Sequence, residues 1–291
     1  MSDIILNSEG YPLNGWRIDV EDFDTLEKTS QDGWQKQVEG LYAEPEEIDP
    51  RPFHRVENQL QQGACQGHAN SSIGEQANHI ATGENLQFSR QFCYIETQRI
   101  DGLIGRDQGS TITGGEQLAK TRGYPLESFW EYTGRYVMSP PGGIQACYDD
   151  AKKRLIKTTA AIRSYDEGRR FLGAGLGGIL IGITMNASMH SGGLIESYDP
   201  NLSGGGHAMA FLGYSKRTDR TGRKYWWLLN SWGTNWGQKG WAEVAPAAID
   251  AMFRSRYTVM RGLSDMAVNE IKPRPIDWSQ TNPLFRRKGR T

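Results

Sequence analysis

Apolar and polar residues follow different patterns in the two halves of this 291-residue chain. In the first half, residues 65–83 and 89–102 place small or apolar side chains at helical spacing, and each stretch closes near a glycine. The stretch "EQLAKTRG" at 116–123 predicts a third, shorter helix that also ends at a glycine. The first half is therefore expected to be mainly helical.

The second half contains apolar runs of the strand type, separated by Gly, Pro and Asp. These runs are residues 177–185, 204–215, 224–232 and 240–246. Helices followed by antiparallel strands indicate an α+β protein with two packed subdomains. Residues 1–47 are acidic and lack a sustained apolar face, so we expect an arm or cap over the main body. Residues 263–291 are expected to form a polar tail with a basic end.

Composition narrows the class of protein only slightly. The formal net charge of −1 gives no reason to expect a specific nucleic-acid partner or an anionic membrane. No apolar run reaches the roughly 20 residues that cross a bilayer. Three cysteines are too few and too uneven for a disulfide framework, and the start lacks the pattern of a secretory signal. We therefore expect a reducing compartment, the cytoplasm, or a virion.

Cys65 is the residue on which a functional interpretation depends. A free cysteine is more often core filler than a nucleophile, so other residues must supply a mechanism. Cys65 follows Gly-Ala and opens a predicted helix, a position that lowers the pKa of a thiol and leaves it exposed. His207 is the candidate base, because "GGGHAMAFLGY" places it at the start of a strand behind glycines that permit close approach. Asn230, at the end of an apolar strand, is the candidate that orients the imidazole ring.

The stretches "QGAC", "HAMAFLGY" and "NSWGTNWGQKGW" resemble the cysteine, histidine and asparagine motifs of the papain-like cysteine proteases, the peptidase C1 family. The interval from Cys65 to His207 is 207 − 65 = 142 residues, within the range of about 130–150 found in that family. The resemblance covers about residues 48–262. It implies a helical subdomain, an antiparallel β-barrel-like subdomain, and an active-site cleft between them.

The resemblance also implies a role for individual residues. Cys65 would attack a peptide carbonyl, His207 would exchange the proton, and Asn230 would hold the ring. Gln59 lies six residues before Cys65 and would form the oxyanion hole with the Cys65 backbone N–H. The implied enzyme is an endopeptidase that acts on a peptide or protein substrate and needs no cofactor or metal. The implied substrate-binding residues are Gly114, Gly115, Gly206, Ala208 and Trp232.

Departures from the family pattern leave other functions open. Gln66 stands where an aromatic residue usually follows the nucleophile, and Gln62 stands where secreted members have a disulfide cysteine. No long propeptide with the family signature precedes the domain, which suggests a bacterial or phage-type branch. One alternative is a structural or assembly protein, such as a virion component, with a dormant site and with its polar ends held by neighbouring subunits. Another is an acyl transferase or amidase on the same scaffold.

Overall fold

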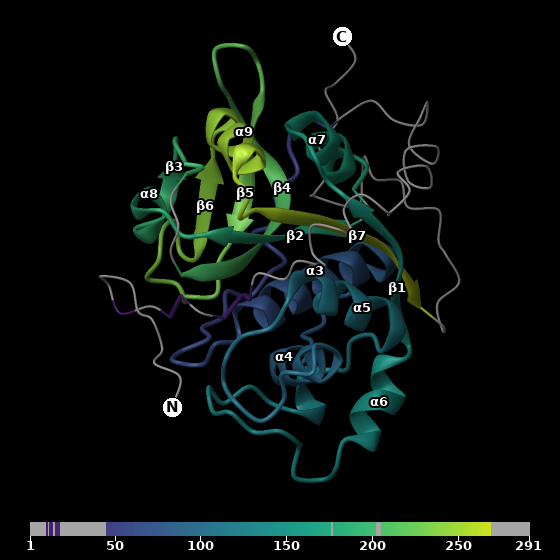
Figure 1. Ribbon diagram of the computed structural model, residues 1–291. Helices are drawn as coiled ribbons and strands as arrows, with labels where there is room; N and C mark the ends of the chain where they lie inside the picture. The colour runs from purple at the N-terminus through teal and green to yellow at the C-terminus, as the bar shows by residue number, and fades with distance from the viewer. Residues whose placement is uncertain are drawn as a thin grey trace.

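The two predicted subdomains appear as a group of helices packed against one face of a sheet. The structure is a computed structural model that describes residues 10, 12–13, 15–17, 45–175, 177–201 and 205–268. Figure 1 shows α3, α4, α5 and α6 below the sheet, with α7 and α9 above it. The predicted α+β class is confirmed.

The central helix of the lower layer is α3 (Cys65–Thr82), which is buried along almost its whole length. Its small residues explain that burial, because neighbouring rings press directly on its backbone. A Cβ at Gly67 would lie 2.7 Å from the backbone nitrogen of Tyr94, and one at Gly74 would lie 2.9 Å from the Tyr124 ring. The other lower helices are α4 (Arg90–Ile100), α5 (Ile112–Thr121), η1 (Glu127–Phe129) and α6 (Gln145–Ala151).

The first two predicted helices are confirmed, whereas the third begins four residues earlier than the sequence pattern indicated. Thr111 caps α5, because its Oγ1 accepts a hydrogen bond from the Gly114 N–H at 2.9 Å. Gly114 and Gly115 therefore lie in the first turn of a helix and not in an extended segment before it. The Thr-Ile-Thr-Gly-Gly sequence contains three β-branched residues and two glycines, which are poor helix formers, so the periodicity argument missed this helix start.

The sheet has seven strands in the order β1-β7-β2-β4-β5-β6-β3, and only β3 and β6 pair in parallel. The four predicted strands are present as β2, β4, β5 and β6. Strands β1, β3 and β7 were not predicted from the sequence. Because β7 continues to Val268, the predicted boundary at 262/263 falls inside a strand. The strands are β1 (Arg154–Ala161), β2 (Gly177–Thr184), β3 (Gly193–Ile195), β4 (Gly206–Thr218), β5 (Lys224–Leu229), β6 (Trp241–Val244) and β7 (Val259–Val268). The upper helices are α7 (Tyr165–Gly173), α8 (Ala187–His190) and α9 (Pro246–Arg254).

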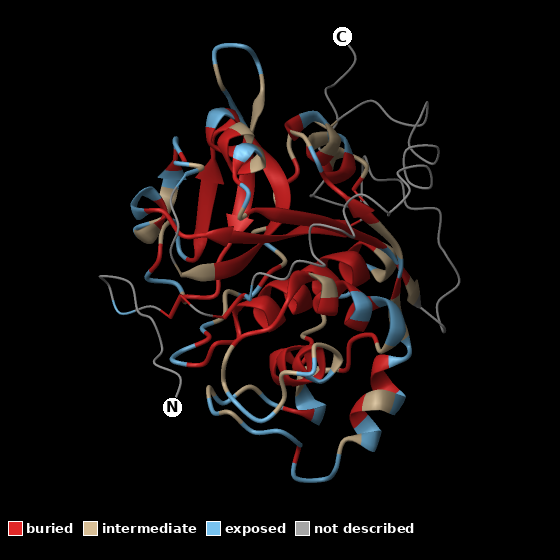
Figure 2. Ribbon diagram, in the orientation of Figure 1, coloured by how far each residue is buried: buried red, intermediate tan, exposed pale blue. Residues whose placement is uncertain are grey.

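The helical layer and the sheet share one buried core along α3. Helix α3 packs against β2, β4 and β7, and Figure 2 shows that the buried residues concentrate along this seam. A buried ion pair joins the layers as well, because Arg261 Nε of β7 lies 2.9 Å from Glu116 Oε2 of α5. Within the described ranges, no helix is long and apolar enough to span a membrane.

The turn that leads into α3 is attached to the loop before α5 by one carboxylate. The Gly63 N–H donates to Asp107 Oδ1 at 3.0 Å, and the Tyr94 hydroxyl donates to the same oxygen at 2.6 Å. The Tyr94 hydroxyl also accepts from the Gly109 N–H at 3.2 Å. Because the three cysteines are unpaired, this hydrogen-bonded carboxylate is the cross-link that holds the turn before Cys65.

Two substitutions of Asp107 distinguish the contribution of its hydrogen-bond acceptor from that of its negative charge. Asp107→Leu leaves two buried donors without an acceptor, so the free energy of unfolding should fall by about 2 to 3 kcal/mol. Asp107→Asn keeps an acceptor oxygen and should lower it by less than about 1 kcal/mol. Urea unfolding measures both values. Equal losses for the two variants would contradict this role of the hydrogen bonds.

Candidate active site

Cys65 is the first residue of α3, and its thiol lies against strand β4. The Ala208 N–H donates to Cys65 Sγ at 3.2 Å, and the Cys65 side chain is fully buried. Antiparallel pairing of β4 with β2 and β5 fixes the position of this N–H. The start of a helix and a strand residue 143 positions away in sequence therefore meet at one sulfur atom.

His207 precedes Ala208 on β4, and Asn230 holds its ring. His207 Nε2 and Asn230 Oδ1 are 2.7 Å apart, and Asn230 Oδ1 also accepts from the Ser231 N–H at 2.7 Å. Because that oxygen is an acceptor, Nε2 of His207 carries the hydrogen and Nδ1 has the free lone pair. Trp232 covers the imidazole, with ring centroids 4.7 Å apart. Nδ1 has no hydrogen-bond partner among the described residues.

Gln59 lies at the same junction, and a serine fixes the orientation of its amide. Ser231 Oγ donates to Gln59 Oε1 at 2.6 Å, whereas Gln59 Nε2 donates to the Gln62 carbonyl oxygen at 3.0 Å. The Gln59 N–H also donates to the Ser231 carbonyl oxygen at 2.8 Å. Nε2 carries a second hydrogen that remains for another acceptor. Sequence analysis did not identify Ser231, although it belongs to the quoted Asn-Ser-Trp motif.

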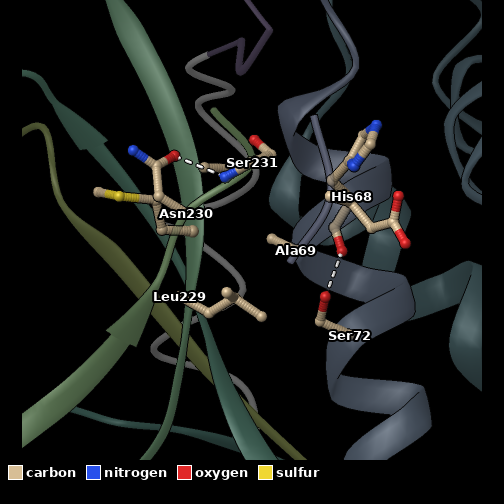
Figure 3. Close-up of a pocket in the computed structure, with 9 residues that line it drawn as sticks. His68, Ala69, Ser72, Leu229, Asn230 and Ser231 are labelled. Carbon is tan, nitrogen blue, oxygen red and sulfur yellow. Dashed lines mark hydrogen bonds between the residues drawn. The ribbon is translucent and has the colours of Figure 1, made fainter. Parts of the chain in front are cut away.

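A small pocket separates α3 from the end of β5 beside this junction. Figure 3 shows His68, Ala69 and Ser72 on the helix and, across the pocket, Leu229 at the end of β5 with Asn230 and Ser231 just beyond it. Burial lowers the pKa of His68 well below its usual value, so this ring is neutral. Polar atoms therefore lie on both walls of the pocket.

The described residues between 10 and 17, which we call the covering segment, pass directly over Cys65. A Cβ at Gly15 would collide with Cys65 Sγ and lie 3.0 Å from the Cys65 backbone nitrogen. The segment pairs with Ser110, whose N–H donates to the Gly15 carbonyl at 3.2 Å and whose carbonyl accepts from the Arg17 N–H at 3.0 Å. Two side chains of the covering segment, those of Leu13 and Trp16, are themselves buried. Part of the expected N-terminal arm thus closes the site.

Burial beneath this segment suppresses both charges of the expected ion pair. Desolvation raises the pKa of the Cys65 thiol to about 12, although the N–H groups of Ala208 and Gln66 act in the opposite direction. Desolvation lowers the pKa of His207 to about 4, against the effect of Asn230. The expectation of an exposed thiol with a lowered pKa is therefore wrong for this state. The helix start is where the sequence placed it, but the covering segment excludes water from it.

The two glycines expected to bind substrate through their backbones have other roles. The Gly114 N–H is bonded to Thr111, and the Gly115 carbonyl accepts from Asn70 Nδ2 at 2.9 Å. Both glycines allow α5 to pack closely, and these hydrogen bonds lie within the helix and with α3. Ser110, just before the helix, is the residue that pairs with an extended segment in this structure.

The other expected residues lie around the thiol and the imidazole. Gly206 opens β4 beneath the covering segment, and a Cβ there would lie 2.6 Å from the Trp16 carbonyl oxygen. Ala208 reaches the thiol through its N–H, as described above. Trp232 is 1% exposed and shields His207 from water. Cys93 and Cys147 are buried elsewhere in the helical layer. In the part of the chain that the structure describes, His, Cys, Asp and Glu form no cluster suited to a metal ion.

Several curated proteins are similar to this chain in sequence. Cathepsin J of Mus musculus is 25% identical over 210 residues, which are 65% of this chain and 56% of that protein. Cathepsin K of Gallus gallus is 27% identical over 204 residues, with 65% and 54% covered. The chain therefore spans little more than half the length of these curated relatives.

Two solved structures share the fold. Xylellain, a cysteine protease from Xylella fastidiosa, superposes with a TM-score of 0.63 at 21% identity, covering 87% of this chain and 96% of its own. The bromelain protease of Ananas comosus in complex with the E64 inhibitor gives 0.56 at 19% identity, covering 76% and 99%. A family model described as papain family cysteine protease matches residues 44–256. The chain belongs to the papain family of cysteine proteases.

Proposed function

We propose that this protein is a cysteine endopeptidase in which Cys65, His207 and Asn230 form a catalytic triad. The observation that carries the proposal is that hydrogen bonds hold the three side chains close together. The N–H next to His207 bonds the Cys65 sulfur at 3.2 Å, and Asn230 binds the far side of the same imidazole at 2.7 Å. This leaves His207 Nδ1, the nitrogen with a free lone pair, to exchange a proton with the thiol.

In this proposal, the reaction begins once the covering segment has left and water reaches the site. Proton transfer from the thiol to His207 Nδ1 gives a thiolate and an imidazolium. The sulfur attacks a peptide carbonyl carbon, and the carbon–nitrogen bond then breaks as His207 gives its proton to the departing amine. Water, deprotonated by His207, attacks the thioester and releases the acid and the thiol. Asn230 holds the ring throughout.

Gln59 is proposed to stabilise the oxyanion, with the Cys65 backbone N–H as the second donor. The Ser231 hydroxyl supports this role, because it occupies Gln59 Oε1 and thereby directs Nε2 toward the turn before Cys65. Ser231 is thus a positioning residue, since it acts on the reaction only through the Gln59 amide. A donor held in place before the reaction stabilises charge without reorganisation at the moment of transfer.

The covering segment is proposed to keep the enzyme latent, as part of a cap formed by residues 1–47. Its own cleavage is disfavoured by the orientation of its backbone. The Gly15 carbonyl oxygen accepts a hydrogen bond from the Ser110 N–H and is thereby held away from the proposed oxyanion donors. The assembly alternative has no support from the described residues.

Gly15 is the position at which latency can be tested in the full-length chain. Gly15→Val introduces a side chain where Cys65 Sγ and backbone atoms leave no room, so the segment should leave the site. The Cys65 pKa should then fall from about 12 to below neutral as the ion pair forms. Ultraviolet absorbance of the thiolate, followed against pH, should show about one thiolate at pH 7 for the variant and none for the natural chain.

Three further variants define that result. Gly142→Val is the matched control, because nothing lies within 4 Å of a Cβ at that glycine. Cys65→Ala in the Gly15→Val chain should remove the thiolate signal. Trp16→Ala should give the signal without a bulky residue over the sulfur. Unchanged thiol titration in both Gly15→Val and Trp16→Ala would contradict latency by this segment.

Ser231→Ala tests how the Gln59 amide is positioned. In the Gly15→Val chain, Gln59→Ala should lower kcat on a peptide substrate by about 100-fold. Ser231→Ala should lower kcat by about 10-fold with little change in KM, since one hydrogen bond of about 1 kcal/mol is lost. Ser188→Ala removes a hydroxyl that bonds only the distant Ser197 carbonyl and is the control. Full activity of Ser231→Ala in the double variant would show that Gln59 needs no such support.

A further inference from the structure

Gln66 follows Cys65 on the first turn of α3, and its buried side chain has no part in the reaction described above. Its Oε1 accepts a hydrogen bond from the Ser110 hydroxyl at 3.0 Å. Ser110 is fully buried as well, and it lies 44 positions away in sequence, just before α5. A direct hydrogen bond therefore joins the residue after the thiol to the residue that pairs with the covering segment.

The backbone of Ser110 uses both of its polar groups to hold an extended chain across the site. Its N–H donates to the Gly15 carbonyl oxygen at 3.2 Å, and its carbonyl oxygen accepts from the Arg17 N–H at 3.0 Å. Because both backbone groups bind the covering segment, the side chain is the part of Ser110 that attaches this residue to the helical layer.

The neighbours of Ser110 are attached to a different helix. The Gly109 N–H donates to the Tyr94 hydroxyl at 3.2 Å, and the Thr111 N–H donates to Asp101 Oδ2 at 2.8 Å. Tyr94 belongs to α4, and Asp101 is the C-terminal cap of that helix. These bonds place the loop relative to α4, whereas the bond of the Ser110 side chain places it relative to α3 and so relative to the sulfur.

The second glycine of α5 leaves the space that the Gln66 amide occupies. A Cβ at Gly115 would collide with Gln66 Nε2 and lie 3.2 Å from Asn70 Nδ2. Alanine is a better helix former than glycine, so a glycine here serves packing and not helix formation. The absence of a side chain at position 115 lets the Gln66 amide lie where it can reach Ser110.

We propose that Gln66 is a positioning residue, whose side chain holds the chain-pairing backbone of Ser110 at a fixed place relative to the Cys65 sulfur. The proposal rests on the proposed peptidase function, because a peptide substrate would replace the covering segment and pair with the same two backbone groups. Loss of the bond should weaken the binding of either chain. One hydrogen bond is involved, so the expected loss of affinity is about 5-fold.

The covering segment allows the role of Gln66 to be measured without any turnover. The rate at which iodoacetamide modifies Cys65 in the full-length chain reports how often the segment leaves the site. Gln66→Met keeps the length of the side chain but removes its amide, and Ser110→Ala removes the hydroxyl. Each variant should increase the rate about 5-fold.

The double variant shows whether these two side chains act through one bond. Gln66→Met combined with Ser110→Ala should react no faster than either single variant, because both changes remove the same hydrogen bond. A rate increase equal to the product of the two single effects would overturn the proposal. So would single variants that react at the rate of the natural chain.

Gly115→Ala displaces the Gln66 amide by a different route. It should increase the alkylation rate about 5-fold in the natural chain, but less than about 2-fold in a Gln66→Ala chain, where the space is empty. An equal effect in both backgrounds would contradict the proposal. Gly142→Ala is the matched control, because nothing lies within 4 Å of a Cβ at that glycine.

A second buried glutamine of α3 separates positioning from loss of stability. Gln76 binds His54 Nε2 at 2.8 Å and the Leu212 carbonyl oxygen at 3.2 Å. Gln76→Met should lower the urea midpoint at least as much as Gln66→Met, yet change the alkylation rate by less than about 2-fold. An equal increase in rate for both variants would overturn the proposal, since any loss of stability in α3 would then have the same effect.

Kinetics on a peptide substrate extend the test to the proposed reaction. In the Gly15→Val chain, Gln66→Met should raise KM about 5-fold and change kcat by less than about 2-fold, as expected when binding is lost equally from substrate and transition state. A fall in kcat at unchanged KM would overturn the role of Gln66 and leave the peptidase standing. No cleavage of any peptide would contradict the peptidase, and the alkylation rates would still decide the role of Gln66.

Discussion

The contact between the start of α3 and strand β4 is the constraint on which the site depends. Neither element carries a complete mechanism, since α3 provides a thiol and β4 provides a histidine with its neighbouring N–H. They meet because a helix of small residues can lie close against the sheet along its whole length. Asp107 fixes the turn on the helix side, and the hydrogen bonds of β4 with β2 and β5 fix the strand side.

The covering segment explains why a complete set of groups is uncharged in this structure. A thiolate and an imidazolium stabilise one another only where water or dipoles can solvate both of them. Gly15 and Trp16 remove that water, which raises the pKa of Cys65 and lowers that of His207. In the proposed mechanism, the same two residues would exclude substrate and suppress the reactive ion pair. A single physical change, the departure of the segment, would reverse both effects.

The sequence alone was enough to identify candidate site residues that lie in short, recognisable motifs. Cys65, His207 and Asn230 lie in distinct local patterns, and the structure brings them together. Strand β7 was not predicted because its residues include buried polar groups. Arg261, for example, is fully buried in β7, where an ion pair with Glu116 on a distant helix offsets the cost of burying its charge.

The residues around the covering segment were harder to predict for a related reason. A Gly-Gly pair is compatible with an extended segment or with a tightly packed helix, and the cap at Thr111 decides between them. Ser110 and Trp16 come from two distant parts of the chain. Their distance from Cys65 depends on the register of the sheet and on the path of the covering segment. Neither can be predicted from a local sequence pattern.

Covalent labelling with E64 tests the central claim most directly, namely that Cys65 and His207 form a working pair. The full-length Gly15→Val chain would be treated at neutral pH, and the adduct located by peptide mapping. The account predicts rapid modification of Cys65 alone, with Cys93 and Cys147 unmodified, and a large loss of rate in His207→Ala. Absence of an adduct on Cys65, or a rate independent of His207, would contradict it.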